Sequence, residues 1–206
     1  MIIHTMPQRS EEWFAVRCGK FTASDFGVLM PSSKQSMADF NKTQMAIIYR
    51  VAAERMTGIP VADGYVSKAM QHGIDTEDEA RISYMLETGK EVKQVGFVEY
   101  DEWIGCSPDG LVGDDAGLEI KCPNSDTHLR YFSDHGELTA DYYWQCMGGM
   151  LCTDRLWWDL YSYDPRFKNE AQKSVLVSIR RDNDEIRNMR ERLDHAIEKV
   201  KAICET

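Results

Sequence analysis

Two short apolar segments, separated by the turn sequence Gly-Asp-Asp-Ala-Gly, most constrain the fold of this chain. The first lies within residues 105–112 and the second covers residues 118–122. Apolar segments of about four to eight residues that flank a turn rich in Gly and Asp are typical of strands joined in a hairpin. Side chains alternate between the two faces of a strand, so Glu119 and Lys121 share one face and the apolar residues share the other. The sequence therefore predicts a β-hairpin with a carboxylate and an amine on one face.

The remaining segments predict helices that alternate with strands. No repeat or linker rich in Pro and Gly divides the chain, so we expect one domain over residues 1–206. The order of elements predicts an α/β (α+β) fold with a mixed central β-sheet flanked by helices. The expected helices cover residues 10–18, 22–30, 39–56, 70–87 and 138–152 and the tail from residue 184, and the expected strands cover 95–100, 103–106, 111–112, 118–122, 156–163 and 175–180.

The cysteines and the hydropathy pattern indicate the cellular compartment. The six cysteines form no CxxC pair, which argues against a zinc site and favours small core residues in a reducing compartment. No apolar stretch approaches the roughly 18 residues of a membrane helix, and the first residues lack the basic start and apolar run of a secretory signal. We therefore expect a cytoplasmic protein with no membrane partner.

The net charge of −10 at pH 7 does not exclude a nucleic-acid partner. Phosphate binding favours lysine and arginine, which at first argues against such a partner. A nuclease that binds metal needs carboxylates, however, and a local basic channel can coexist with an acidic outer surface. The charge is therefore compatible with both classes of protein.

The acidic residues of the hairpin predict a divalent metal site. Asp109 can approach Glu119 across the hairpin, and two converging carboxylates repel each other unless a cation lies between them. Oxygen ligands without a cluster of His or Cys favour Mg²⁺, with Mn²⁺ as a substitute. Lys121 could then orient a water or contact the scissile phosphate, and Glu77 supplies a third acid from a helix face that we expect to point inward among apolar neighbours. In the competing interpretation, Asp109-Gly110 is only a turn and Glu119 and Lys121 form a solvated pair.

At this hairpin the chain resembles a known nuclease family. Ser-Pro-Asp-Gly followed by Leu-Glu-Ile-Lys-Cys-Pro is similar to the PD-(D/E)xK signature of the phage lambda exonuclease, or YqaJ-type viral recombinase, family. The resemblance implies a restriction-endonuclease-like core. It extends from about residue 10 to the end of the chain, through W-x3-R-x-G at 13–19, T-A-S at 22–24, G-x3-E-x2-A-R at 73–81 and Y-D-P-R at 163–166.

The resemblance implies roles for individual residues. Asp109, Glu119 and the backbone carbonyl of Ile120 would bind metal, Glu77 would complete the site for a second ion or its water, and Lys121 would be the catalytic lysine. A terminal 5′-phosphate would be held by four further residues, since arginine forks and hydroxyls bind phosphate oxygens. These four residues are Arg17, Ser24, Ser107 and Gln145.

Three further positions complete the comparison with the family. Met70 takes the place of an apolar wedge against the last base pair, and Lys68 lies beside it in the sequence. A methionine in a helical stripe is also a common core residue, which is the competing interpretation of Met70. Met147 departs from the pattern, because some relatives have a second glutamine there.

The resulting expectation is a Mg²⁺-dependent exonuclease that degrades one strand of double-stranded DNA from its 5′ end. It would leave 3′ overhangs for homologous recombination by strand annealing. The resemblance further implies a homotrimeric ring and a single-strand annealing protein as partner. Two alternatives stay open: an endonuclease with the same centre, and a non-enzymatic acidic protein that mimics DNA or binds a partner.

Overall fold

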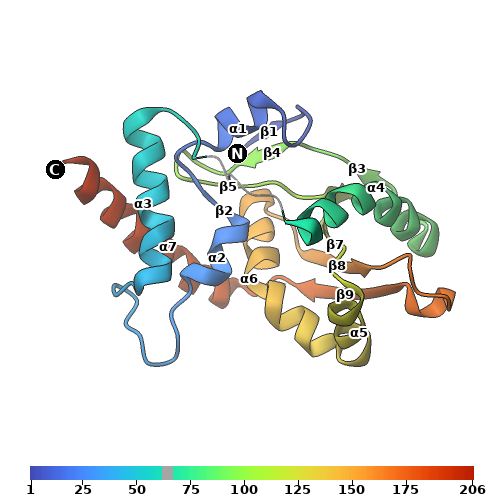
Figure 1. Ribbon diagram of the computed structural model, residues 1–206. Helices are drawn as coiled ribbons and strands as arrows, with labels where there is room; N and C mark the ends of the chain where they lie inside the picture. Colours follow the sequence, from blue (N-terminus) through green and yellow to red (C-terminus); the bar gives the residue numbers. More distant parts are fainter. Residues whose placement is uncertain (62–66) are drawn as a thin grey trace.

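The computed structural model describes residues 1–61 and 67–206 as two mixed β-sheets with helices packed around them (Figure 1). The sequence predicted an α+β fold with a mixed sheet, and this is confirmed, except that the strands form two sheets instead of one. The helices are α1 (Glu11–Arg17), α2 (Ala23–Leu29), α3 (Lys42–Thr57), α4 (Lys68–Thr88), α5 (Ser125–Ser133), α6 (His135–Thr153) and α7 (Asn183–Cys204), with a short 3-10 turn at Glu170–Gln172.

The first sheet has the order β1-β4-β5-β2. Its strands are β1 (Ile2–His4), β2 (Phe21–Thr22), β4 (Phe97–Glu99) and β5 (Ile104–Cys106). β1, β4 and β5 pair antiparallel, whereas β2 runs parallel to β5. β1 and β2 are so short that the sequence pattern did not predict them.

The second sheet has the order β3-β6-β7-β8-β9 and carries the predicted hairpin. β6 and β7 are antiparallel partners, and β7 pairs in parallel with β8. Gly113, with φ of 52°, lies in the turn between β6 and β7, where glycine tolerates this left-handed conformation. The strands are β3 (Val92–Lys93), β6 (Gly110–Val112), β7 (Ala116–Lys121), β8 (Trp157–Tyr163) and β9 (Ser174–Arg180).

Helix α6 packs against strands of both sheets and against α2 (Figure 1). Close approach depends on small residues: a Cβ added at Gly148 would lie 2.4 Å from the Phe26 ring, and one at Gly149 would lie 2.6 Å from the Trp158 ring. The helix therefore passes directly over the core. Gln145, which lies one helical turn before these glycines, reaches the end of β7.

The helix ends are set by local capping residues. The Asp25 carboxylate accepts a hydrogen bond from the Thr22 amide at 2.8 Å, which is part of the capping box that begins α2. Gly58 ends α3 in the left-handed conformation, with φ of 68°. In α7 an apolar stripe is buried in the core, so this C-terminal helix packs on the core; the residues of the stripe are Ile186, Met189, Leu193, Ile197 and Val200.

The cysteines are only partly core residues. Four are buried, whereas Cys18 is half-buried and Cys204 is exposed. The segment that became α5 was not predicted. In the part of the chain that the structure describes, no helix is long and apolar enough to span a membrane.

Candidate active site

The Asp109 side chain lies where the β6–β7 hairpin ends. Its backbone amide donates to the Leu118 carbonyl at 3.1 Å, and the Ile120 amide donates to its carboxylate at 2.6 Å. The Asp109 carboxylate thus takes the place of the backbone carbonyl that would accept this hydrogen bond if the pairing of the two strands continued. This bond fixes Asp109 beside Glu119, the neighbour of Ile120.

The two hairpin acids lie in surroundings that disfavour their negative charge. Burial raises the pKa of Asp109 well above its ordinary value, and the nearby charges of Glu119 and Glu77 raise it further. Burial also raises the pKa of Glu119, although Lys121 opposes the shift. A cation placed between these acids would relieve the repulsion.

Lys121 is the cation closest to Glu119 in the hairpin. Its ammonium group donates to Oε1 of Glu119 at 2.8 Å and to the amide oxygen of Gln145 at 3.1 Å, and it lies 4.3 Å from the centre of the Tyr142 ring. Burial alone would lower the pKa of Lys121, but the charges of Glu119 and Asp109 outweigh it and raise the pKa. Lys121 therefore stays charged throughout the physiological range.

The interpretation of Glu119 and Lys121 as a solvated surface pair is wrong. Glu119 is 5% exposed, and the side chain of Lys121 is 20% exposed. Gln145 donates to the same oxygen of Glu119 at 2.6 Å, so the pair belongs to a hydrogen-bonded network across β7 and α6.

We predicted that Glu77 points inward among apolar neighbours. The predicted neighbours are wrong, because the Glu77 carboxylate contacts arginines. Its two carboxylate oxygens form ion pairs, one with Arg81 at 2.7 Å and one with Arg9 at 3.1 Å. Arg81 also donates to the Asp109 carbonyl at 3.2 Å. Glu77 is thus close enough to affect Asp109 electrostatically, but arginines surround it.

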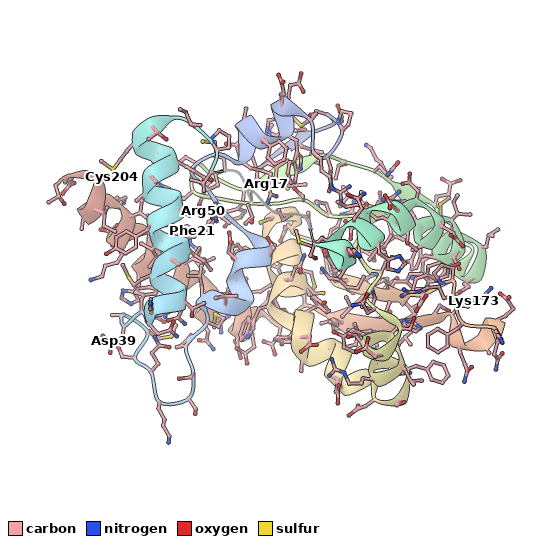
Figure 2. The ribbon with its side chains drawn as sticks, viewed as in Figure 1. Arg17, Phe21, Asp39, Arg50, Lys173 and Cys204 are labelled. Atoms are coloured by element: carbon pink, nitrogen blue, oxygen red, sulfur yellow. The ribbon has the colours of Figure 1, made fainter. Side chains whose placement is uncertain are left out.

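A cavity of about 160 Å³ joins the hairpin acids to the residues predicted to bind phosphate. Arg17 donates to the Ser107 hydroxyl at 2.8 Å and stacks 4.0 Å from the centre of the Trp13 ring. Figure 2 shows Arg17 between α1 and α6, toward the middle of the molecule. The lining includes Asp109 and Glu119 together with Arg17, Ser24, Ser107 and Gln145.

The cavity is suited to an anion on the side of Arg17. Burial lowers the pKa of Arg17 to about 10, so the guanidinium stays charged at neutral pH although it has lost part of its hydration. The Ser24 hydroxyl lines the same cavity and lies 3.0 Å from the Thr22 hydroxyl. A guanidinium and two hydroxyls at one end of a cavity form a typical phosphate site.

The remaining predicted positions separate into two groups. Met70 is 49% exposed and lines a larger adjoining cavity of about 550 Å³, so it is not a core residue. Lys68 is exposed at the first turn of α4. Met147 is buried in the core and does not reach either cavity.

Residues 12–156 match the YqaJ-like viral recombinase domain. The chain belongs to this family. An alkaline exonuclease (LHK-Exo) from Laribacter hongkongensis is 33% identical to it, with 95% of each chain covered and a TM-score of 0.85. The same enzyme in complex with dAMP gives 33% identity, the same coverage and a TM-score of 0.84.

A phage-related exonuclease from Haemophilus somnus 129PT shares the fold at 18% identity, with a TM-score of 0.75 over 90% of this chain and 95% of that one. Curated proteins give no significant match. The family and the 33% identical exonuclease confirm the resemblance seen in the sequence, and they show that this YqaJ-like domain is a nuclease.

The donor set of the YqaJ-like domain fits a hard divalent cation. Among residues 1–61 and 67–206, no three acidic, His or Cys side chains converge as a complete metal cage. Asp109 and Glu119 nevertheless face one cavity with raised pKa values, and the Ile120 carbonyl belongs to the same strand. Mg²⁺ is usually bound by one or two carboxylates and keeps several waters, so two carboxylates fit an ion of this kind.

Sequence reasoning assigned no site role to four residues that the geometry places here. Trp13 donates to the Ser107 hydroxyl at 2.9 Å, and Tyr142 lies under the Lys121 ammonium. Arg9 and Arg81 hold Glu77. Arg81 and Trp13 had local signals, because Arg81 stands four residues after Glu77 and Trp13 four residues before Arg17, each pair on one helix. The other contacts join distant segments.

Proposed function

We propose that residues 1–206 act as one Mg²⁺-dependent exonuclease domain that degrades one strand of double-stranded DNA from the 5′ end. The 3′ overhangs would serve homologous recombination by strand annealing. One observation carries the proposal: a single cavity is lined both by the carboxylates Asp109 and Glu119 and by the anion-binding groups of Arg17, Ser24 and Ser107. The alkaline exonuclease relative supports the same assignment.

The acids would hold the metal, with Asp109, Glu119 and the Ile120 carbonyl as ligands and Glu77 for a second ion or its water. Mg²⁺ would activate a water and offset charge at the phosphoryl group, and Mn²⁺ would substitute for it. Lys121, which stays charged, would donate to the attacking water or to the scissile phosphate. Arg17 and the two serines would hold the terminal phosphate and so place the first phosphodiester near the acids.

Binding of a strand end in the pocket would distinguish an exonuclease from an endonuclease. Digestion of a linear duplex and of a covalently closed circle, each with Mg²⁺, Mn²⁺, Ca²⁺ or chelator, tests the proposal. We expect mononucleotide release from the 5′ ends of the linear duplex and no cut in the circle. Cleavage of the circle would favour the endonuclease, and no cleavage of either DNA with any ion would reject the function.

The assembly and the partners belong to the same proposal. A homotrimeric ring would thread DNA, and exposed apolar residues are available to bury between subunits: Ile2 and Ile3 on β1, and Ile82 and Leu86 one turn apart on α4. A single-strand annealing protein would receive the 3′ overhang, in the cytoplasm of a phage-infected or bacterial cell. Light scattering on the purified protein measures the subunit number, and a dimer or monomer would reject the ring.

A further inference from the structure

Arg9 adopts a backbone conformation that arginine rarely adopts. Its φ is 68°, at the third position of a turn in which the Ser10 amide donates to the Pro7 carbonyl at 3.3 Å. Glycine is favoured at such a position, because the Cβ of any other residue crowds the backbone there. The backbone therefore does not explain the arginine, and the reason for it must lie in the side chain.

The turn is tied to the segment that carries Asp109. The Gln8 amide group donates to the Pro108 carbonyl at 3.0 Å and to the Val95 carbonyl at 3.4 Å. Pro108 directly precedes Asp109. The Arg9 side chain therefore starts from a fixed point beside the candidate metal site.

The guanidinium group of Arg9 is a second cation beside Glu77. Arg81 already pairs with one oxygen of Glu77 at 2.7 Å, and it is held further by Asp78 and the Asp109 carbonyl. Among the residues that the structure describes, Arg9 has one side-chain ion pair, at 3.1 Å to the other oxygen, and its side chain is 47% exposed against 9% for Arg81. Arg9 is thus the partner that can leave Glu77.

Arg9 also faces the space that leads to the phosphate pocket. It lines the cavity of about 550 Å³ together with Arg17, Ser24 and Met70. A strand that ends at Arg17 and is cut near Asp109 would bring its backbone phosphates past this position. An arginine there can bind phosphate with two parallel hydrogen bonds, whereas Arg9 makes a single hydrogen bond to Glu77.

We propose that Arg9 is a further DNA-binding residue, which exchanges Glu77 for a backbone phosphate when the substrate strand enters. The inference rests on the proposed function. The exchange also frees one oxygen of Glu77, the acid predicted to complete the metal site. Arg9 thereby couples the arrival of DNA to the availability of a metal ligand.

Binding of a 5′-phosphorylated duplex in Ca²⁺, labelled at the far end and titrated over a range of salt, tests the exchange. Arg9→Met removes the charge and keeps the backbone strain, whereas Arg9→Gly removes both; Arg187→Met is the matched control at an exposed arginine on α7. We expect both Arg9 variants to raise Kd about three- to tenfold and to flatten the slope of log Kd against log salt by about 0.9, the value for one lost phosphate contact. Arg187→Met should change neither.

Thermal melting separates these effects from damage to the fold. Arg9→Gly should melt at a higher temperature than Arg9→Met, because only the glycine relieves the turn. An unchanged salt slope in both Arg9 variants, or a fall in kcat alone, would overturn the inference and leave Arg9 as a partner of Glu77 only. Failure of the proposed function appears differently, as a wild-type protein that cleaves no DNA, while the salt slopes still report the phosphate contact.

Discussion

The ammonium group of Lys121 lies 2.8 Å from Oε1 of Glu119. Glu119 is buried, so its carboxylate without a cation beside it would destabilise the fold. Alternation along β7 places both side chains on one face, and α6 adds Gln145 to the same oxygen. Replacing the lysine therefore removes both the proposed catalytic cation and the counter-charge of the buried Glu119 and the half-buried Asp109. Its effect on activity and its effect on stability must be measured separately.

Asp109→Ala, Glu119→Ala and Lys121→Ala should each reduce cleavage by about 10²-fold or more, as expected for groups that act on the transition state. The fold should survive, because the opposite face of β7 keeps its apolar packing. Single-turnover cleavage and circular dichroism measure the two effects. Lys173→Ala is the control, since Lys173 lies far from Arg17 in Figure 2; cleavage near the wild-type rate by folded Lys121→Ala would contradict the assigned role.

Calcium should support DNA binding without turnover. Ca²⁺ occupies oxygen sites, but its looser geometry and weaker activation of water suit this chemistry poorly. Binding measured by anisotropy and product formation measured on gels, both with Ca²⁺ alone, check the prediction. Brisk cleavage under these conditions would count against the metal-activated mechanism.

The hairpin and its acids could be predicted because their signals are local. Alternation over residues 118–122 sets the face of Glu119 and Lys121, and the Gly-Asp turn sets the pairing of the two strands. The helix ends at Thr22 and Gly58 follow from side chains within a few residues of them. Each of these features depends on short stretches of sequence.

The features that sequence reasoning missed depend on contacts between distant segments. β1 is only three residues long and pairs with β4 more than ninety positions later, so neither length nor periodicity reveals it. The partner Arg9 of Glu77 stands 68 positions away. A helical pattern that placed Glu77 inward could not show that arginines, not apolar groups, would meet it there.

Asp159→Asn should destabilise the fold at neutral pH and less so in acid. Burial alone would raise the pKa of Asp159, but hydrogen bonds from Lys90, Ser178 and Tyr84 hold it below its ordinary value. A carboxylate with a lowered folded pKa stabilises the protein above the unfolded value of about 3.9 and loses that effect as pH falls through the folded pKa.

We expect Asp159→Asn to lower the free energy of unfolding by about 1–3 kcal/mol at pH 7, the range for hydrogen bonds to a charged group. Urea denaturation from pH 7 to pH 3 measures the difference from wild type, which should narrow below about pH 4. Tyr84→Phe is the matched control: it removes one of the three donors to Asp159 and keeps the carboxylate. A difference that is constant over this range would show that the Asp159 charge contributes nothing.

The contact between Arg17 and Ser107 leads to a prediction that distinguishes an exonuclease from an endonuclease with the same metal centre. If both residues hold a terminal phosphate, a duplex with 5′-phosphate should be digested faster than one with 5′-hydroxyl. Charge-assisted hydrogen bonds contribute about 1.5–3 kcal/mol, which corresponds to a preference of roughly tenfold or more when end binding limits the rate. The preference is the ratio of kcat/KM on the two ends.

Arg17→Ala should erase this preference and keep the dependence on Mg²⁺, because the metal candidates belong to the β6–β7 hairpin and to α4, whereas Arg17 belongs to α1. Arg17→Lys keeps the charge but loses the planar fork, so it should retain part of the preference. The Met147 departure from the family pattern concerns a buried side chain and leaves the sign of the effect unchanged. Equal rates on both ends in the wild type, or an undiminished preference in Arg17→Ala, would show that the pocket does not bind the terminal phosphate, and would favour the endonuclease.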